Sequence, residues 1–564
     1  MKRIFEEIKE RRLWQTLIVY CGGGFGLMQV VDILLNRLGL PASYFTIFLV
    51  FLVAGVPGSL IVAWFHGKEG AQRIRKTEVI LQLVLLLAAL GVSYHFTTAG
   101  NFLLHEGPLD DRSIAVLPFV DLSPNKDQEY FSDGLSEELL NLLSRNTGLK
   151  VICRTSSFSF KGKNEDVRTI SAILGVANIV EGSVQKSGDK LRISVQLIDA
   201  RDGTNRWSQT FDREMKSIFA LEDEIAQTVV GELKATVSLD RQASGSPERN
   251  TEAYNLFLLG RYFHQLGGRE NIAKSIETLK RALRIDSTDA QAWTELAAAY
   301  SSQSDYGYIG TAEGYALARE AVRKAVLLDN TLAVAHGELA WISMAYDWDW
   351  PAAETEFRTA LSLEPGNVEL IRNSATLSAI LGKRNDAIGL FRESVSLDPV
   401  KFGSQVSFLF YAYQLLSAEK FEDARAECAK ALRADSQAVL LHLFSGFAAL
   451  LEQRFEVAGS DIRMEVDSSY RLWGTILYHT AVGRRDSAES ELERFISLYQ
   501  NEDAYQICEV YAYRGEIGEA FRWMERAYLQ RDGGLLLVKS DPFLAKLRSD
   551  PRYVLFLRKM NLPV

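Results

Sequence analysis

Side chains able to perform acid–base, nucleophilic or metal chemistry are scattered along this 564-residue chain. The seven histidines occur singly, and no His-Glu-x-x-His, Cys-x-x-Cys, Gly-x-Ser-x-Gly or phosphate-loop Gly-x-x-x-x-Gly-Lys pattern is present. Catalysis needs a nucleophile, a base and an orienting group close together, and nothing in the sequence predicts such a group. We therefore predict no catalytic residue, no metal site and no bound cofactor, and expect a protein that is not an enzyme.

Two short polar stretches are the strongest candidates for a reactive or ligand-binding group. Asp133, Glu137 and Glu138 could form an acid–base set, but a helix starting here explains them through capping and the helix dipole. Between Phe158 and Lys163, aromatic and basic residues alternate, which is compatible with stacking on nucleic acid. An acidic chain favours a ligand or protein contact, or an ordinary loop, and we predict no nucleic-acid binding.

Cysteine and glycine add no redox or phosphate chemistry. Cys153 falls on a predicted strand, and Cys428 and Cys508 fall on apolar helix positions, so we expect buried thiols, with a single Cys428–Cys508 bond left open. The run from Cys21 to Gly26 resembles a phosphate-binding loop superficially. It lies inside an apolar segment with no preceding strand, which favours helix packing in lipid.

The elements that must position any functional surface are repeats in the second half of the chain. Small residues alternate with a large residue one turn later, as at Ala387 and Phe391, and an acidic residue closes each unit. The closing residues Asp329, Glu364 and Asp398 are separated by 35 and 34 positions, the spacing of a helix–turn–helix array. We predict about seven such units over residues 250–564, with a capping segment at the C-terminus.

This pattern resembles the tetratricopeptide repeat family, whose first-helix signature is matched by Trp293, Leu296, Ala297 and Tyr300. The resemblance implies an all-α solenoid whose concave face binds proteins. First-helix positions that do not pack within the array should line that face. The predicted partner-binding residues are Thr294, Trp341, Arg372 and Tyr413.

One loop of the array, Asp347-Trp348-Asp349-Trp350-Pro351, has two interpretations. It could be an acidic–aromatic contact for a partner. Alternatively, Asp349 caps a helix, Pro351 occupies its first turn and the indoles pack between repeats. The second interpretation is the simpler one.

Three long apolar segments precede the soluble part, at about residues 13–35, 41–65 and 79–104. Each is long enough for a hydrocarbon core that requires about 20 residues. Residues 1–105 carry ten Lys/Arg and six Asp/Glu, a net of +4, which leaves −13 for the remainder of a chain of charge −9. We predict a membrane anchor of three transmembrane helices over residues 1–105.

The distribution of basic residues predicts the orientation of that anchor. Five Lys/Arg precede the first segment and four lie between the second and third, whereas the first connection has only Arg37. The positive-inside rule then places the N-terminus in the cytoplasm. Three crossings would put everything after about residue 105 in the periplasm, in the inner membrane of a Gram-negative cell.

Residues 112–240 form a predicted α/β module between the anchor and the repeats. Apolar alternation and helix stripes give the order βαβαβββα, with strands expected at 113–120 and 149–154 and a three-strand meander at 179–211. That order implies one mixed sheet with helices packed on it. A short polar linker at residues 245–250 leads into the array.

The module resembles the amino-terminal domain of the TolB-like family. The resemblance is carried by Ser-Ile-Ala-Val-Leu-Pro-Phe (113–119), Tyr-Phe-Ser-Asp-Gly-Leu-Ser-Glu-Glu-Leu (130–139), Arg-Thr-Ser-Ser-Phe (154–158) and Gln-Leu-Ile-Asp-Ala (196–200). With the apolar segments before it, the arrangement is similar to the non-catalytic part of membrane-bound class III adenylate cyclases and CadC-type regulators. Only about a dozen residues precede the first segment, so neither output domain is expected.

The sequence thus predicts a multidomain protein: a three-helix transmembrane region, a mixed α/β sandwich and a tetratricopeptide solenoid. The expected function is a membrane-anchored, non-enzymatic interaction scaffold that holds a protein partner in the periplasm. The alternative is a ligand-sensing signalling component whose cyclase or DNA-binding output is supplied by another protein. The partner, the ligand and the oligomeric state stay open.

Overall fold

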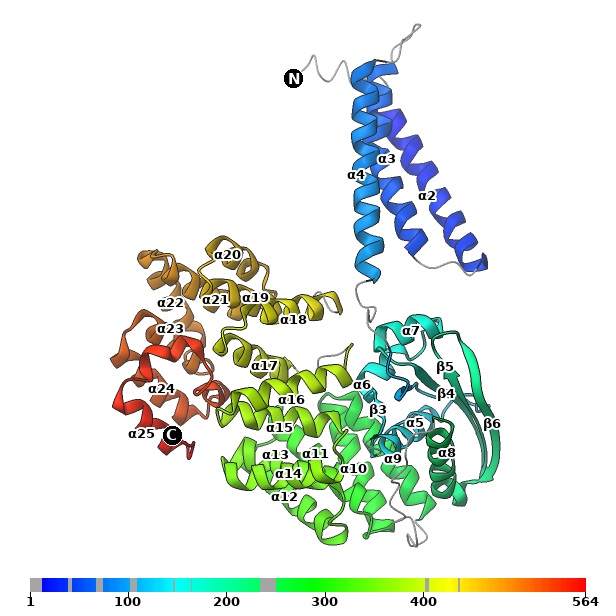
Figure 1. Cartoon of the computed structure of the whole chain (residues 1–564), viewed down its shortest axis with the longest axis vertical. Coiled ribbons are helices and arrows are strands. Elements are labelled where there is room, and N and C mark those ends of the chain that lie inside the picture. The colour runs from blue at the N-terminus through cyan, green and yellow to red at the C-terminus, as the bar shows by residue number, and fades with distance from the viewer. Residues whose placement is uncertain are drawn as a thin grey trace. The chain divides into compact units, whose positions relative to one another are not determined.

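The computed structural model describes residues 13–38, 43–66, 75–101, 109–145, 148–163, 165–233, 250–400, 405–434 and 437–564. The chain divides into an N-terminal unit, Met1–Leu104, and a compact second unit, His105–Val564 (Figure 1). Each unit is described by itself.

The N-terminal unit is a bundle of three helices that cover the three apolar segments. They are α2 (Leu13–Leu38), α3 (Ser43–His66) and α4 (Lys76–Asn101). Polar side chains link them: the Tyr20 hydroxyl donates to the Leu52 carbonyl at 3.0 Å, and the Gln82 amide donates to the Gly58 carbonyl at 2.8 Å. These side-chain bonds to backbone carbonyls tie neighbouring helices together, as polar groups do between helices in an apolar surrounding.

One of the three predicted membrane crossings is supported. Among the described residues one helical stretch, Ile47–His66, is long and apolar enough to cross a membrane. The other two crossings stay predictions. The predicted end of the third segment, residues 102–104, lies outside the described residues.

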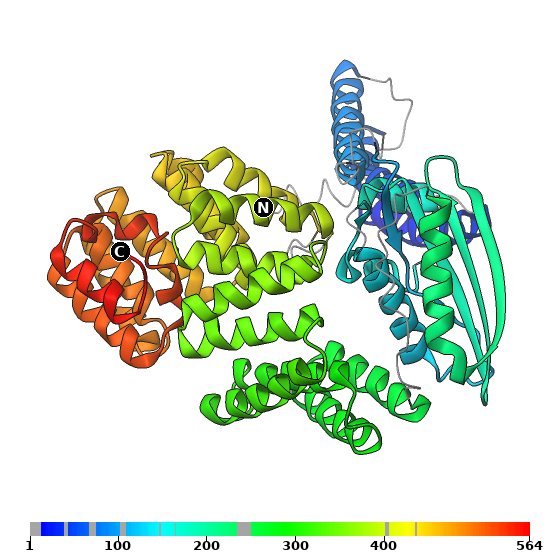
Figure 2. The ribbon, with the colours of Figure 1, turned by 60° about the horizontal axis from the view of Figure 1, so that its bottom comes forward.

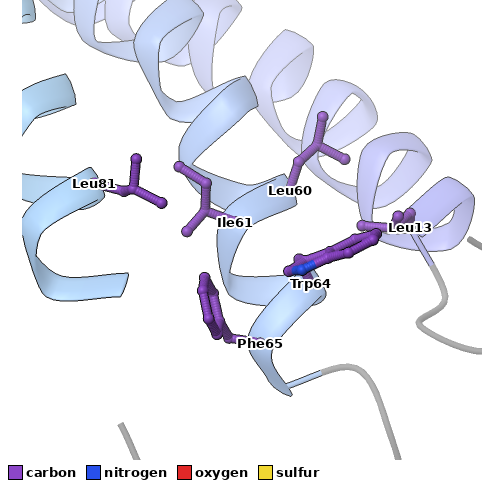
Figure 3. A pocket seen from close by; sticks show the side chains of 6 residues that line it. All are labelled: Leu13, Leu60, Ile61, Trp64, Phe65 and Leu81. Atoms are coloured by element: carbon purple, nitrogen blue, oxygen red, sulfur yellow. The ribbon is translucent and has the colours of Figure 1, made fainter. Parts of the chain in front are cut away.

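A pocket of about 330 Å³ lies at one end of this bundle (Figure 3). Its lining comes from all three helices and is almost wholly apolar, formed by Leu13, Leu60, Ile61, Trp64, Phe65 and Leu81. A neighbouring polar link joins the His66 imidazole to the Glu78 carboxylate at 2.9 Å. The indole N–H of Trp64 is the one hydrogen-bonding group among these six side chains.

The second unit begins with the α/β domain. Its elements are β1 (Ser113–Val116), β2 (Val120–Asp121), α5 (Glu129–Ser144), β3 (Lys150–Val151), α6 (Arg154–Ser157), η1 (Phe158–Phe160), α7 (Val167–Leu174), β4 (Asn178–Ser187), β5 (Lys190–Asp199), β6 (Thr204–Glu214), η2 (Met215–Ser217) and α8 (Ile218–Glu232). The strand order is β3-β1-β4-β5-β6, with β2 also paired to β4. β1 runs parallel to β3 and β4, whereas β4, β5 and β6 form an antiparallel meander.

The predicted mixed sheet and its meander are confirmed. Gly188 and Gly203 adopt φ of +60° and +78° at the two hairpin turns, a conformation that glycine tolerates without strain. The strand predicted at residues 149–154 is reduced to two residues, because helix α6 begins at Arg154. Helices α5 and α8 cover one face of the sheet, and α7 packs on the other.

The remainder of the second unit is an array of antiparallel helix pairs (Figure 2). The described residues contain eight pairs: α9 (Thr251–Leu266) with α10 (Arg269–Ile285), α11 (Ala290–Asp305) with α12 (Thr311–Leu328), α13 (Ala333–Ile342) with α14 (Trp350–Leu363), α15 (Val368–Ile380) with α16 (Arg384–Leu397), α17 (Gln405–Ser417) with α18 (Phe421–Ala434), α19 (Leu441–Leu451) with α20 (Phe455–Met464), α21 (Ser468–Ala481) with α22 (Arg485–Tyr499), and α23 (Ala504–Arg514) with α24 (Ile517–Gln530). The first helices of successive pairs contact one another along the inner side.

After α24 the chain forms η4 (Gly533–Leu537), η5 (Pro542–Leu547) and α25 (Pro551–Lys559). Between α13 and α14 lies a π-helical turn, η3 (Ser343–Asp347). Asp349 caps α14 by accepting a bond from the Ala352 amide, and Trp350 is buried. The structural interpretation of the Asp-Trp-Asp-Trp-Pro loop is thus confirmed. All four cysteines are free thiols, so the Cys428–Cys508 bond does not form.

Close helix approach within a pair can be tested at two helical glycines. A Cβ on Gly260 in α9 would lie 2.6 Å from Leu279 of α10, whereas a Cβ on Gly389 in α16 meets nothing within 4 Å. We expect Gly260→Ala to lower the free energy of unfolding by about 1–3 kcal/mol through overpacking. Gly389→Ala should raise it by up to about 1 kcal/mol, because alanine favours the helix. Urea unfolding of both variants checks this, and equal effects would contradict the packing.

Candidate interaction surfaces

The four residues predicted to contact a partner lie at different depths in the structure. Thr294 is 7% exposed and its hydroxyl donates to the Ala290 carbonyl of its own helix. Arg372 and Tyr413 are also buried, at 8% and 1% exposed. Trp341 is half-buried on α13. Three of the four side chains therefore contribute to the interior of the protein.

The chain's own C-terminal segment accounts for the burial of Tyr413. Residues 533–562 pack against the first helices of the middle and later repeats, and their apolar side chains belong to the same core. The Phe543 ring packs edge-on against Phe447 with centroids 4.9 Å apart, and the Lys539 amine donates to the Leu381 carbonyl at 2.9 Å. The predicted cap therefore also fills the inner side of the array.

Two carboxyl groups are enclosed where this segment meets the array. The Tyr413 hydroxyl donates to Glu509 at 2.7 Å, and the Tyr505 hydroxyl donates to Asp541 at 3.0 Å. Burial and the neighbouring Asp541 charge raise the pKa of Glu509 well above its ordinary value. Burial also raises the pKa of Asp541, although bonds to its carboxylate oppose this. Two like charges this close cannot both ionise, so Glu509 keeps its proton at neutral pH.

This buried acid gives the second unit a pH-dependent stability. The folded-state pKa of Glu509 is raised, so above about pH 4.5 the unfolded chain loses a proton that the folded chain keeps. The free energy of unfolding should therefore fall as pH rises, by up to about 1.4 kcal/mol per pH unit from this group. Glu509→Gln should flatten that slope.

Urea unfolding between pH 5 and pH 8 gives the slope of the free energy of unfolding against pH, and the effect is the difference in slope between the wild type and Glu509→Gln. Glu489→Gln is the matched control, because Glu489 is 57% exposed beside Arg514. An unchanged slope in Glu509→Gln would show that Glu509 is ionised in the folded protein.

The α/β domain covers the other end of the inner side. Leu258 of α9 packs onto Gly134 of α5, where a Cβ would lie 2.8 Å from the leucine. The Tyr254 hydroxyl donates to Glu222 of α8 at 2.7 Å. One continuous hydrophobic core includes the sheet, α5, α8 and the first helix pairs of the array. The α/β domain and the start of the array are therefore a single packed body.

A second contact joins the α/β domain to the fourth helix pair. The Ser156 hydroxyl of α6 donates to the Asp398 carboxylate at 2.6 Å, and the Arg372 guanidinium donates to the same carboxylate at 2.9 Å. The Cys153 amide also donates to the Leu397 carbonyl at 2.9 Å. Arg372 thus holds the loop that receives the α/β domain.

Breaking this ion pair from one side should be costly. The Asp398 side chain is fully buried and that of Arg372 is 10% exposed, so Asp398→Ala leaves a buried guanidinium without a counter-charge. We expect a loss of about 3–5 kcal/mol in the free energy of unfolding. Asp423→Ala is the control, because Asp423 pairs with Arg392 but is 47% exposed. This variant should lose about 1 kcal/mol or less in the free energy of unfolding. Similar losses in both variants would contradict this assignment.

The acidic set predicted from the sequence meets the aromatic–basic loop. The Lys161 amine lies 2.5 Å from Glu129 and 2.6 Å from Asp133. Arg154 pairs with Glu137 at 3.0 Å and lies over the ring of Phe158. Arg261 of α9 pairs with Glu138 at 2.8 Å. Each acidic group is matched by a cation, so this cluster joins α5 to α6, to the loop after α6 and to α9.

A polar surface lies on the first helices of the first three repeats, α9, α11 and α13. We call it the inner patch, and it consists of His264, Glu295, Ser302, Glu338 and Trp341. The two nitrogens of His264 lie 2.6 Å from Glu295 and 2.9 Å from Ser302. The Ser301 hydroxyl donates to Glu338 at 2.5 Å. These side chains are half-buried, so their outer edges stay accessible.

The inner patch is rich in carboxyl groups and is ordered by hydrogen bonds. Burial raises the pKa of Glu338 to about 7, with the Asp305 charge adding to this and the Ser301 hydroxyl opposing it. Burial acts to lower the pKa of His264, but the bond to Glu295 and the charges of Glu295 and Glu338 outweigh it and raise the pKa. Within the described residues, no group of three His, Cys, Asp or Glu side chains is arranged to hold a metal ion. The sequence signalled only Trp341 here.

In a comparison with known protein families, the α/β domain is the part of the chain that matches. Residues 110–228 match the second domain of HilA/YgeH-like transcriptional regulators. A protein of Rhizobium meliloti strain 1021, provisionally named adenylate cyclase 3, is 39% identical over 189 residues. That alignment covers 33% of this chain and 32% of the cyclase, so the chain spans about a third of the length of this curated relative.

Solved structures similar to this chain are helical repeat proteins. PilW, a type IV pilus biogenesis factor, is 18% identical, with 39% of this chain and 96% of PilW covered and a TM-score of 0.32. Yeast Tom70 is 13% identical, with 95% and 99% covered and a TM-score of 0.33. A human IFIT1 dimer with m7Gppp-AAAA is 12% identical, with 71% and 99% covered and a TM-score of 0.34. Likenesses of this size establish neither the fold nor the function of this chain.

Proposed function

We propose that this chain is a membrane-anchored, non-enzymatic scaffold that binds a protein partner through its repeat array. The observation that carries the proposal is the inner patch, whose five side chains on the first three repeats each keep part of their surface exposed. Its carboxylates Glu295 and Glu338 and the neighbouring Asp305 outnumber the imidazole of His264. The partner therefore presents a cationic segment, with an apolar group beside it for the Trp341 indole.

The anchor and the compartment form the second part of the proposal. The apolar stretch Ile47–His66 supports an anchor, and the basic residues around the N-terminal helices support a cytoplasmic N-terminus. Crossing by all three helices would put the α/β domain and the array in the periplasm. The resemblance of residues 112–240 to the TolB-like domain is compatible with that location.

A second candidate is a signalling component that senses a ligand and depends on another protein for output. Similarity to a HilA/YgeH-like domain and to part of a protein named as an adenylate cyclase favours it. The shared core would pass a change in the α/β domain directly to the array. A cytoplasmic partner at residues 1–12 or 66–78 would distinguish this candidate from the scaffold.

The inner patch can be tested by charge reversal in cells. We expect Glu338→Lys to abolish crosslinking of the partner to a photoreactive residue placed at Ala298, which lies between Glu295 and Ser302 on α11 and is partly exposed, because the lysine repels its cationic segment. Glu320→Lys is the matched control, since Glu320 is 66% exposed on α12, outside the patch, and crosslinking should persist. Crosslinking that survives Glu338→Lys would remove the inner patch as the binding site.

The membrane topology needs a separate measurement. Reporter fusions at about residue 108 and at the C-terminus should both score as exported. A cytoplasmic signal from both would eliminate the periplasmic location and leave the patch assignment untouched.

A further inference from the structure

Strand β6 is a long strand at the open edge of the sheet. It comprises eleven residues, Thr204–Glu214, and the part of the chain that the structure describes pairs only its β5 side. The opposite edge, β3, is two residues long, and the adjoining Cys153 amide bonds to the array. An exposed edge strand presents unpaired backbone N–H and C=O groups that can accept a further strand.

The side chains along β6 carry a pattern of opposite charges. Arg206 is held by the Asp199 carboxylate of β5 through Nε and Nη2, at 3.2 and 2.6 Å, which leaves Nη1 for a second acceptor. At the other end of β6, Asp212 accepts two bonds from Arg192 of β5, at 2.7 and 3.1 Å. A carboxylate has about four acceptor sites, so Asp212 has capacity for a second guanidinium.

We propose that β6 pairs with β6 of a second copy of this chain, antiparallel and with Gln209 opposite Gln209. Gln209 is the midpoint of Thr204–Glu214, so this register pairs the whole strand. It sets Arg206 opposite Asp212, Trp207 opposite Phe211 and Ser208 opposite Thr210, each twice by symmetry. A twofold contact of this kind uses the same surface on both copies.

The charges then alternate across four strands of the joined sheet. Asp199 binds Arg206, Arg206 faces Asp212 of the second copy, and that Asp212 is bound by Arg192 of its own chain. Opposite charges directly across a strand pair stabilise it, and like charges destabilise it. A β-bulge between Leu197 and Ile198 makes Arg206 an extra residue in β6, so regular pairing across the twofold axis runs from Trp207 to Phe211 and the Arg206–Asp212 contacts flank it.

Cysteine scanning of the full chain in detergent tests the register. In a Cys21→Ala background, Gln209→Cys should form a disulfide-linked dimer under mild oxidation, because opposite Cα atoms lie about 4.5–5.5 Å apart. Ser208→Cys and Thr210→Cys should each run as a monomer on non-reducing gels. In each variant the two cysteines of the dimer are offset by two residues along the strands, and their Cα atoms are then more than about 7 Å apart. Mixing those two variants should restore the crosslink.

Charge reversal gives an independent measurement of the same contact. Asp212→Arg sets two arginines opposite each other, and the dimer dissociation constant should rise about tenfold or more in mass photometry, with circular dichroism unchanged. Lys216→Glu, which lies outside β6 in η2, is the control and should dimerise as the wild type does. A monomeric wild type, equal crosslinking at all three positions, or a dimer indifferent to Asp212→Arg would each overturn the proposal.

Discussion

Helix α9 has to bury two sides, and the rest of the second unit depends on how it does so. One side meets α10, where Gly260 lets Leu279 approach closely, and the other meets α5 and α8 through Leu258 and Tyr254. An exposed apolar helix face of this size would be unstable in water. The α/β domain therefore belongs to the first repeat as much as to its own sheet, and residue 240 marks no boundary in the packing.

The same requirement decides which surface is left for a partner. A free-standing repeat array keeps its inner side open. Here the α/β domain covers one part, through its contacts with α9 and with Asp398, and residues 533–562 fill another part. Arg372 and Tyr413 show the result, since each now holds a buried carboxylate instead of facing solvent. The inner patch keeps part of its surface exposed and its side chains are held by hydrogen bonds, which supports the proposal of a short partner segment over a broad docking surface.

Local patterns predicted the local structure well. The Ala and Gly spacing, the closing acidic residues and the alternation at residues 179–211 gave the helix pairs and the meander, because each depends on neighbours within about 35 positions. The burial of Thr294, Arg372 and Tyr413 depends on contacts such as Ser156 with Asp398, 242 positions apart. No periodicity encodes such a contact. Of the membrane prediction, one apolar stretch, Ile47–His66, is supported, and the number of crossings stays a prediction.

The closure of the array at its C-terminal end has a consequence for biosynthesis. The Trp350 indole donates to the Met560 carbonyl at 2.9 Å, across 210 positions of the chain, and Arg531 lies over the rings of Tyr346 and Trp348. Middle repeats thus lack part of their interior until residues 531–562 have been synthesised. Until then their apolar side chains remain uncovered, and such nascent chains require protection from aggregation.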